Sequence, residues 1–150
     1  MPTYLRMDQA AISVPLISNV PTLPYVVSWT TLEGGDLESE DTKTRPGGMQ
    51  PQVNLGGPTT RTDATVTRPY TNELHPFVKP LEDAAGNSAM SISWVILDST
   101  GARPSSAPVI TLHGILKNVT RPNWDANATG TAFLSLVMGC NVDASVSTSL

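Results

Sequence analysis

Few side chains of this sequence could act as a base or a nucleophile. It contains two histidines, His75 and His113, and one cysteine, Cys140. A histidine between a serine and an acid can activate the serine hydroxyl, and His113 is the residue around which such a triad would form. The chain has no G-x-S-x-G or H-E-x-x-H motif and no phosphate-binding glycine loop with its lysine. We therefore interpret both histidines as structural and predict no catalytic residue, no bound cofactor and no enzyme activity.

A run of carboxylates is the one feature that could hold a divalent cation. Five acids occur between residues 33 and 41, and carboxylate oxygens are ligands of hard cations. The run lacks the spacing of an EF-hand loop, so a solvated acidic face is the favoured interpretation. The single Cys140 excludes an intramolecular disulfide and a multi-cysteine zinc site. The sequence thus predicts no metal site, and Cys140 is expected to be a small hydrophobic residue at a strand end.

Length and composition limit the class of protein. The chain has 150 residues, enough for one domain with a buried core, and residues 1–150 are predicted to form a single domain. Thirteen prolines and eleven glycines predict short elements separated by turns. A net charge of −4 argues against tight sequence-specific nucleic-acid binding, which requires a basic face. No segment resembles a membrane span or a signal peptide, so no membrane partner is expected.

Alternating and apolar segments predict a mainly β protein, a sandwich or barrel of about six strands. Val109–Asn118 and Thr131–Cys140 are apolar on both faces and are expected to be covered on both sides. Residues 1–24 are predicted to form an extended, proline-rich N-terminal arm with a short strand at Ala11–Ile17, and residues 141–150 a loose polar tail. The other predicted strands are Tyr25–Leu32, Thr59–Arg68 and Ala89–Asp98.

One segment, Thr71–Ala84, has the periodicity of a helix. Pro76 and Pro80 each remove a backbone donor, so we expect about two to three turns with a disturbed stretch. Such a helix is stable only when it packs on a sheet. Its apolar face consists of Leu74, Phe77, Val78 and Leu81, spaced at i, i+3, i+4 and i+7.

Residues 33–58 cannot build a core of their own. They hold six glycines, three prolines and five acids with few apolar side chains between them. We predict a long loop or a two-stranded hairpin arm with its turn at Pro46-Gly47-Gly48. Two interpretations stay open: a solvated flexible loop, or an ordered arm that packs on another subunit, its glycines acting as hinges that let it fold on assembly.

The order of these features resembles a known family. A strand ends in Trp29-Thr30-Thr31-Leu32-Glu33, a glycine-rich excursion passes through Arg45-Pro46-Gly47-Gly48, and a threonine-rich strand closes with Val66-Thr67-Arg68. A short helix and three strands follow, with a D-x-x-G turn at Asp98 to Gly101. Over residues 25–140 this pattern is similar to the tail-tube proteins of long-tailed phages and the inner tubes of contractile injection systems.

The resemblance implies a structural subunit that forms hexameric rings. In that family, neighbouring sheets join into an inner barrel around a lumen, and the rings stack into a tube. The implied partners are other copies of the chain, with tape-measure, sheath or tail-terminator proteins, and DNA or other cargo passes the lumen without specific binding. The implied location is the virion tail, made in the bacterial host cytoplasm. The resemblance leaves open whether the tail is contractile, and whether the particle is a phage or an injection device.

Two sets of residues carry the expected contacts. Strands that flank the arm should continue a sheet across subunits by β-augmentation. A DNA duplex repels acids and is retarded by unpaired basic side chains, so the lumen should present Asp63, Thr65 and Thr67, with any arginine paired to an acid. The inter-ring contacts expected of the arm are Leu37, Met49, Val53 and Leu55.

The alternative function is a β-sandwich binding module, either a carbohydrate-binding or a capsid-decoration protein. Such a module would carry a planar row of exposed aromatic side chains. Three tryptophans, three tyrosines and two phenylalanines are scattered along the chain, which gives little material for such a row.

Overall fold

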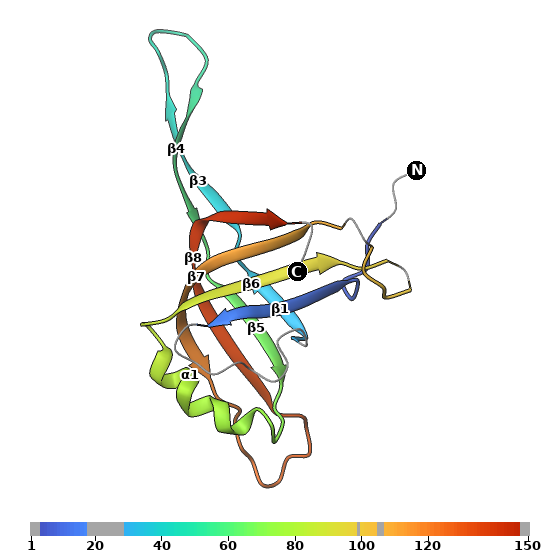
Figure 1. The fold of residues 1–150 in the computed structure, drawn as a ribbon. Helices are drawn as coiled ribbons and strands as arrows, with labels where there is room; N and C mark the ends of the chain where they lie inside the picture. The colour runs from blue at the N-terminus through green and yellow to red at the C-terminus, as the bar shows by residue number, and fades with distance from the viewer. Residues whose placement is uncertain (1–3, 18–28, 99, 105–106, 148–150) are drawn as a thin grey trace.

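A computed structural model describes residues 4–17, 29–98, 100–104 and 107–147. One antiparallel sheet has the strand order β1-β6-β7-β8-β5-β2, and β3 and β4 form a separate two-stranded sheet (Figure 1). The predicted mainly β fold with one short helix and a hairpin arm is confirmed. The elements are β1 (Ala10–Ile17), β2 (Thr31–Gly34), β3 (Leu37–Thr44), β4 (Val53–Arg61), β5 (Ala64–Pro69), the 3-10 helix η1 (His75–Phe77), α1 (Val78–Ala84), β6 (Ala89–Ile96), β7 (Val109–Thr120) and β8 (Phe133–Ser147).

The six-stranded sheet curls around its core. Its edge strands are β1 and β2, and a single bridge joins Ile12 of β1 to Trp29, just before β2, so the two edges approach each other. Trp29 is buried at this seam. The concave face gathers the apolar side chains of all six strands, and the helical segment adds Leu74 and Leu81. Among the largest buried core side chains are Val66, Met90, Ile92, Leu116, Leu134, Leu136 and Met138.

The helical segment has the predicted position and the predicted irregularity. Pro76 lies in η1, and Pro80 is the third residue of α1. Backbone N–H groups in the first turn of a helix have no partner within the helix, so a proline there loses no hydrogen bond. Leu74 and Leu81 are fully buried, while Phe77 is partly buried against the core. The period of the apolar residues therefore identified the face that packs on the sheet.

Truncating the buried helix anchor should destabilise the whole domain. We expect Leu81→Ala to lower the free energy of unfolding by about 2–5 kcal/mol, because the side chain is fully buried and would leave a cavity. The matched control is Lys79→Ala on the exposed side of the same helix, which should leave the free energy of unfolding almost unchanged because it removes only a surface ion pair with Asp83. Urea denaturation measures both values, and similar midpoints for the two variants would contradict the packing.

The prediction of a loose C-terminal tail is wrong for residues 141–147. They extend β8 to Ser147 and pair with the start of β7, where Val109 lies opposite Ser147 and Leu112 opposite Ala144. The sequence is polar here, but ladder hydrogen bonds need only backbone groups, and β7 presents them. Cys140, expected at a strand end, accordingly lies inside β8.

Two further strand predictions need correction. Thr59–Arg68 is not one strand: the chain leaves the arm at Arg61 and enters the main sheet at Ala64. The break is held by backbone hydrogen bonds from Thr62 N to Asp36 O (2.9 Å) and from Gly35 N to Asp63 O (3.2 Å). Near the N-terminus, the predicted strand is present as β1 but belongs to the sheet, paired with β6, rather than to an arm. Residues 25–28 of the predicted strand Tyr25–Leu32 lie outside the described residues, and its last two residues, Thr31 and Leu32, begin β2.

Candidate functional site

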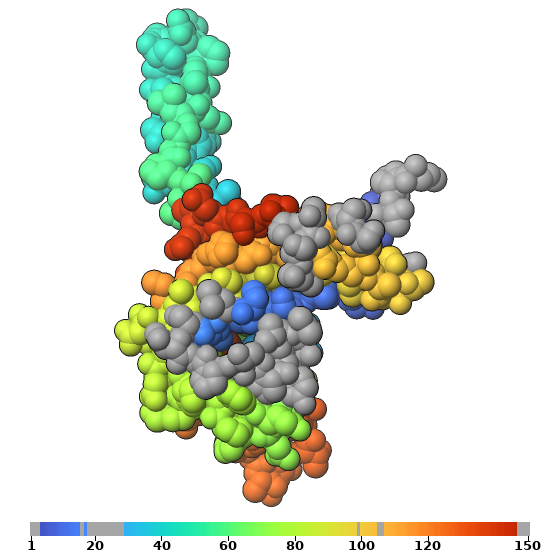
Figure 2. All heavy atoms as spheres, viewed as in Figure 1, coloured from blue at the N-terminus to red at the C-terminus, as the bar shows by residue number. Residues whose placement is uncertain are grey.

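The β3–β4 hairpin projects away from the body of the protein (Figures 1 and 2). The two strands pair from Leu37 opposite Arg61 to Thr44 opposite Val53, and Gln50 N donates to Gly47 O in the turn. Every residue of β3 is exposed, so the hairpin adds nothing to the core. The arm is therefore available for contacts outside this chain.

Hydrogen bonds and glycines fix the base of the arm. Arg61 donates from Nη1 to Gly35 O (2.8 Å) and from Nη2 to Val142 O (2.9 Å), which ties β4 to β8. Gly34 and Gly35 have φ values of 81° and 76°, a region that favours glycine. A Cβ at Gly34 would also lie 2.1 Å from Asp63 O, so the strand crossing admits no side chain there.

The structure places the four predicted inter-ring residues on the surface of the arm. Met49 is fully exposed at the turn, and Leu37, Val53 and Leu55 are each about half exposed along the two strands. None of the four belongs to the buried core clusters. Their contact with another subunit stays a prediction.

The convex face of β2, β5, β8 and the end of β7 is mainly polar, with Val137 and Phe133 of β8 as apolar members, and we call it the polar face. It includes Thr31, Glu33, Asp63, Thr65, Thr67, Asn118, Thr120 and Ser135.

Hydrogen bonds and one ion pair order this surface. Thr67 Oγ1 and Ser135 Oγ lie 3.1 Å apart, and Lys117 Nζ lies 2.7 Å from Asp63 Oδ2. The alternation of β5 assigned the faces correctly, because Ala64, Val66 and Arg68 are buried while Thr65 and Thr67 lie on the other side. Arg68 lies against the Trp29 ring instead, 5.8 Å from its centroid.

Strands β7 and β8 are not covered on both sides along their whole length, so the prediction holds for the start of β7 and is wrong for the rest. Ile115 is 51% exposed and Phe133 is 46% exposed, both on the convex side. The start of β7 is covered on its convex side, where Val109 is buried with Val95 and Ala107 in a second, small cluster. Beyond it, the helix and the opposite strands pack on the concave face of the six-stranded sheet. Apolar side chains on the convex side are left for a partner or for solvent.

The two histidines have hydrogen-bond partners but no catalytic geometry. His113 Nδ1 lies 3.2 Å from Ser91 Oγ and Nε2 lies 2.9 Å from Ser145 Oγ, so both ring nitrogens contact hydroxyls rather than a carboxylate. His75 Nδ1 lies 2.5 Å from the hydroxyl of Tyr70. No cluster of metal-ligating side chains occurs in the described part of the chain, and burial raises the pKa of the half-buried Cys140 thiol.

The D-x-x-G turn after β6 is held by one carboxylate. Asp98 Oδ1 accepts hydrogen bonds from Thr100 Oγ1 (2.6 Å), Thr100 N (2.9 Å) and Ala102 N (3.0 Å), and Gly101 has φ of 85°. These bonds, led by the Thr100 hydroxyl, lower the pKa of Asp98 because they favour the charged form. The turn is thus a structural feature with no free catalytic group.

An aromatic cluster near α1 was missed from sequence. Tyr70 contacts His75 and Trp124 edge-on, with ring centroids 5.8 Å and 5.6 Å away. Arg121 beside it forms an ion pair with Glu82, donating through two nitrogens, which lowers the pKa of the Glu82 carboxyl. The members are distant in sequence and follow no period, so no local signal could have grouped them.

Solved structures with a similar fold come from contractile injection systems. No family model and no curated protein sequence matches this chain, whereas solved structures match it along nearly its whole length. In the six-fold symmetrised baseplate of the anti-feeding prophage, the similar chain has a TM-score of 0.74 and 15% identity, over 97% of each chain. This protein therefore has the fold of contractile injection system components.

Two further structures support the same assignment of fold. The tube-terminating cap of the anti-feeding prophage matches with a TM-score of 0.71 and 12% identity, over 99% of this chain and 94% of that chain. The PVC sheath-tube complex in its extended state matches with a TM-score of 0.68 and 12% identity, over 96% and 91%. Separately, no helix in the described residues is long and apolar enough to cross a bilayer.

Proposed function

We propose that this chain is a non-enzymatic structural subunit of a tail tube, in which copies form rings and the rings stack around a lumen. The fold it shares with tube, cap and baseplate components supports this role. The resemblance in sequence order suggests six copies per ring, and a six-fold symmetrised baseplate contains one of the similar chains.

One observation carries the ring proposal: a block of four strands with two open edges. Strand β7 pairs with β6 only up to Ile115, so no described strand pairs with its far edge at residues 117–120. Strand β2, at the other end of the block, pairs only with β5. The order β7-β8-β5-β2 is antiparallel throughout, so β2 runs antiparallel to β7. A rotated copy would then place its β7 against β2 in an antiparallel pair and continue the sheet.

Of the two strands that flank the arm, only β2 can extend the sheet. Strand β5 is paired on both sides, with β8 and with β2. Unpaired strand edges favour association, because backbone pairing satisfies their N–H and C=O groups without side-chain specificity. We therefore assign the seam between subunits to β2 of one copy and residues 117–120 of the next.

The polar face is proposed to line the lumen. Its one lysine is paired with Asp63, Glu33 gives it a net negative charge, and its other polar groups are hydroxyls and amides. A duplex would meet no unpaired cation there and would release few counterions, so it would pass without binding. In a phage tail the cargo would be DNA, and in an injection device it would be another molecule. The proposed partners are copies of this chain and tape-measure, sheath or tail-terminator proteins, in a particle assembled in a bacterial cytoplasm.

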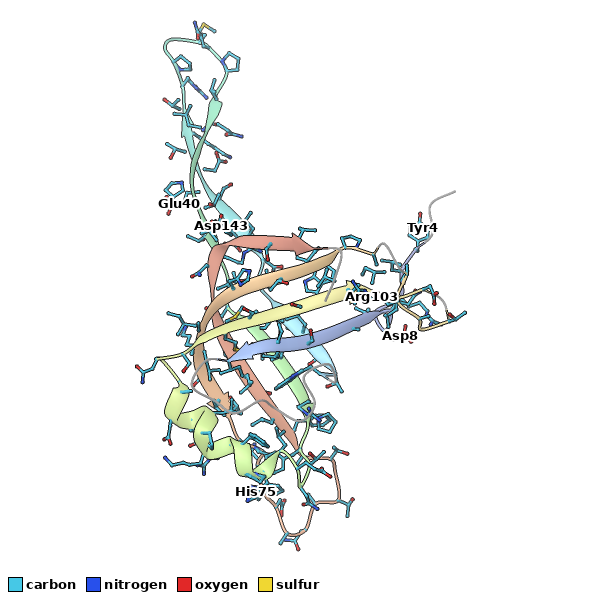
Figure 3. All side chains as sticks on the ribbon, in the orientation of Figure 1. Tyr4, Asp8, Glu40, His75, Arg103 and Asp143 are labelled. Carbon is cyan, nitrogen blue, oxygen red and sulfur yellow. The ribbon has the colours of Figure 1, made fainter. Side chains whose placement is uncertain are left out.

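The alternative binding-module function has less support. A carbohydrate platform needs coplanar exposed rings, but Tyr70 and Trp124 meet at 83°. Among the described residues, the other strongly exposed aromatic side chain is that of Tyr4, which lies near the N-terminus and away from α1 (Figure 3).

A covalent trap across the proposed seam tests the ring. In a Cys140→Ser background, Glu33→Cys combined with Asn118→Cys places one thiol on β2 and one on the end of β7, both on the convex side. Oxidation should give a ladder of linked species that stops at the ring number, read by non-reducing electrophoresis. The control pair, Glu33→Cys with Lys79→Cys on the exposed side of α1, should give no ladder. A wild-type protein that sediments only as a monomer at high concentration, with no rings or tubes in negative-stain images, would overturn the proposal.

A further inference from the structure

The arm and the aromatic cluster lie at opposite ends of the molecule. In Figure 3 the arm that carries Glu40 extends from one end, and His75 marks the other, beside α1. Trp124 is 71% exposed there, although indole is a large apolar group that proteins usually cover. Tyr70 contacts its ring in a T-shaped arrangement, which leaves most of the indole uncovered.

The cluster borders a shaped hollow. A depression of about 230 Å³ is lined by Tyr70, His75, Val78, Lys79, Arg121, Pro122 and Trp124.

Two contacts hold the walls of this hollow in place. The Tyr70 hydroxyl lies 2.5 Å from His75 Nδ1, and Arg121 donates through two nitrogens to the Glu82 carboxylate on α1. The hollow thus exists before any partner arrives, which reduces the entropy lost on binding. We call it the aromatic pocket.

The tip of the arm has the chemistry that fits such a pocket. Residues 45–51 read Arg-Pro-Gly-Gly-Met-Gln-Pro, and the Met49 side chain is fully exposed. Proline rings and methionine thioethers pack well against the faces and edges of aromatic rings. A two-stranded hairpin this narrow can insert one side chain where a sheet face could not.

Charge also favours this pair of surfaces. The outer part of the arm, residues 42–60, contains Lys43 and Arg45 but no acid, and the acids of the arm, Glu38, Glu40 and Asp41, lie nearer its base. At the other end, Glu82 and Asp83 are paired with Arg121 and Lys79. Glu73 and Asp125 form no ion pair among the described residues, so they leave that end negative.

We infer that the arm tip of one copy, centred on Met49, docks in the aromatic pocket of a second copy, against Tyr70 and Trp124. This inference rests on the proposed tube function and adds the acceptor site that the arm would use. Because donor and acceptor lie at opposite ends of one chain, the contact is head-to-tail and does not close on itself within a pair. It therefore extends the assembly from ring to ring in one direction.

A pair of cysteines tests the contact. In Cys140→Ser protein, Met49→Cys with Trp124→Cys, treated with a short bismaleimide, should give a cross-linked ladder that continues beyond the ring number. The matched control uses Tyr4→Cys with Trp124→Cys, because Tyr4 is also strongly exposed but does not lie on the arm. The control should give no ladder.

Single truncations measure how much each side chain of the contact contributes to tube growth. Trp124→Ala and Met49→Ala should each raise the critical concentration for tube growth by roughly tenfold or more, as expected for central interface residues. Tyr4→Ala, which removes an exposed aromatic side chain away from the arm and the pocket, should leave it unchanged, and circular dichroism should show that all three variants fold. If wild-type tubes form and the Glu33–Asn118 pair closes rings, but Trp124→Ala grows tubes at the wild-type concentration and the Met49–Trp124 pair does not cross-link, the pocket is not the acceptor although the tube function stands. If no ring or tube forms at all, both proposals fail.

Discussion

A variant without the arm should fold normally and form no tubes. Ser39 and Thr59 are register partners across the hairpin, so residues 40–58 can be replaced by Asn-Gly, which favours the two-residue turn that joins antiparallel strands. The shortened chain keeps Arg61 and its hydrogen bonds to the sheet. Because the removed residues add nothing to the core, we expect the thermal midpoint to shift by only a few degrees, about the effect of 1 kcal/mol or less.

Circular dichroism, sedimentation and negative-stain images separate the possible outcomes. The expected result is a folded protein that still closes rings through the β2 edge but does not stack them. A matched control, Glu40→Gln, changes one exposed acid of the arm and should grow tubes as the wild type does. Normal tubes from the shortened chain would show that the arm is only a solvated loop, the other interpretation left open by the sequence.

The second large effect concerns the closest approach of two strands. At Gly114 of β7, a Cβ would lie 2.0 Å from the backbone oxygen of Gly139 and 2.9 Å from its carbonyl carbon in β8. Backbone atoms cannot move aside as a flexible side chain can, so Gly114→Ala must separate the two strands. We expect a loss of about 3 kcal/mol or more in the free energy of unfolding, or a failure to fold.

A glycine in the arm provides the control. Gly56 of β4 has no atom within 4 Å of the position its Cβ would take, so Gly56→Ala should change stability by less than about 1 kcal/mol. Urea denaturation compares the two variants directly. A Gly114→Ala protein with a wild-type midpoint would mean that β7 and β8 are farther apart than the structure has them.

Periodicity made part of the fold predictable. The alternation that buries Ala64 and Val66 and the helical spacing of Leu74 and Leu81 are local patterns, and each identified the face that packs inward. The strand at residues 141–147 and the break at Thr62 depend on backbone groups of distant segments, Val109–Leu112 and Gly35–Asp36. The side-chain types of a segment do not predict which distant backbone groups it will pair with.

The candidate site was predictable to a similar extent. The arm was found because a segment with so few apolar residues cannot support a core, and the polar side of β5 was found from its threonines. The aromatic pocket was not found, because Tyr70 and Trp124 meet only after β5 has paired with β8, which brings the end of β5 beside the connection between β7 and β8. The open edges of β2 and β7 likewise follow from strand order, which no local pattern determines.

The paired state of the arm has a consequence for the speed of assembly. If the glycines let the arm fold only on contact, each addition would include an ordering step, and growth would slow as that step became limiting. In the single chain, β3 and β4 are already hydrogen-bonded and Arg61 fixes their base. The arm therefore meets its partner as a preformed hairpin, and its conformational entropy was already lost when the chain folded. Elongation should then be limited by collision, with a rate proportional to the concentration of free rings and no plateau at high concentration.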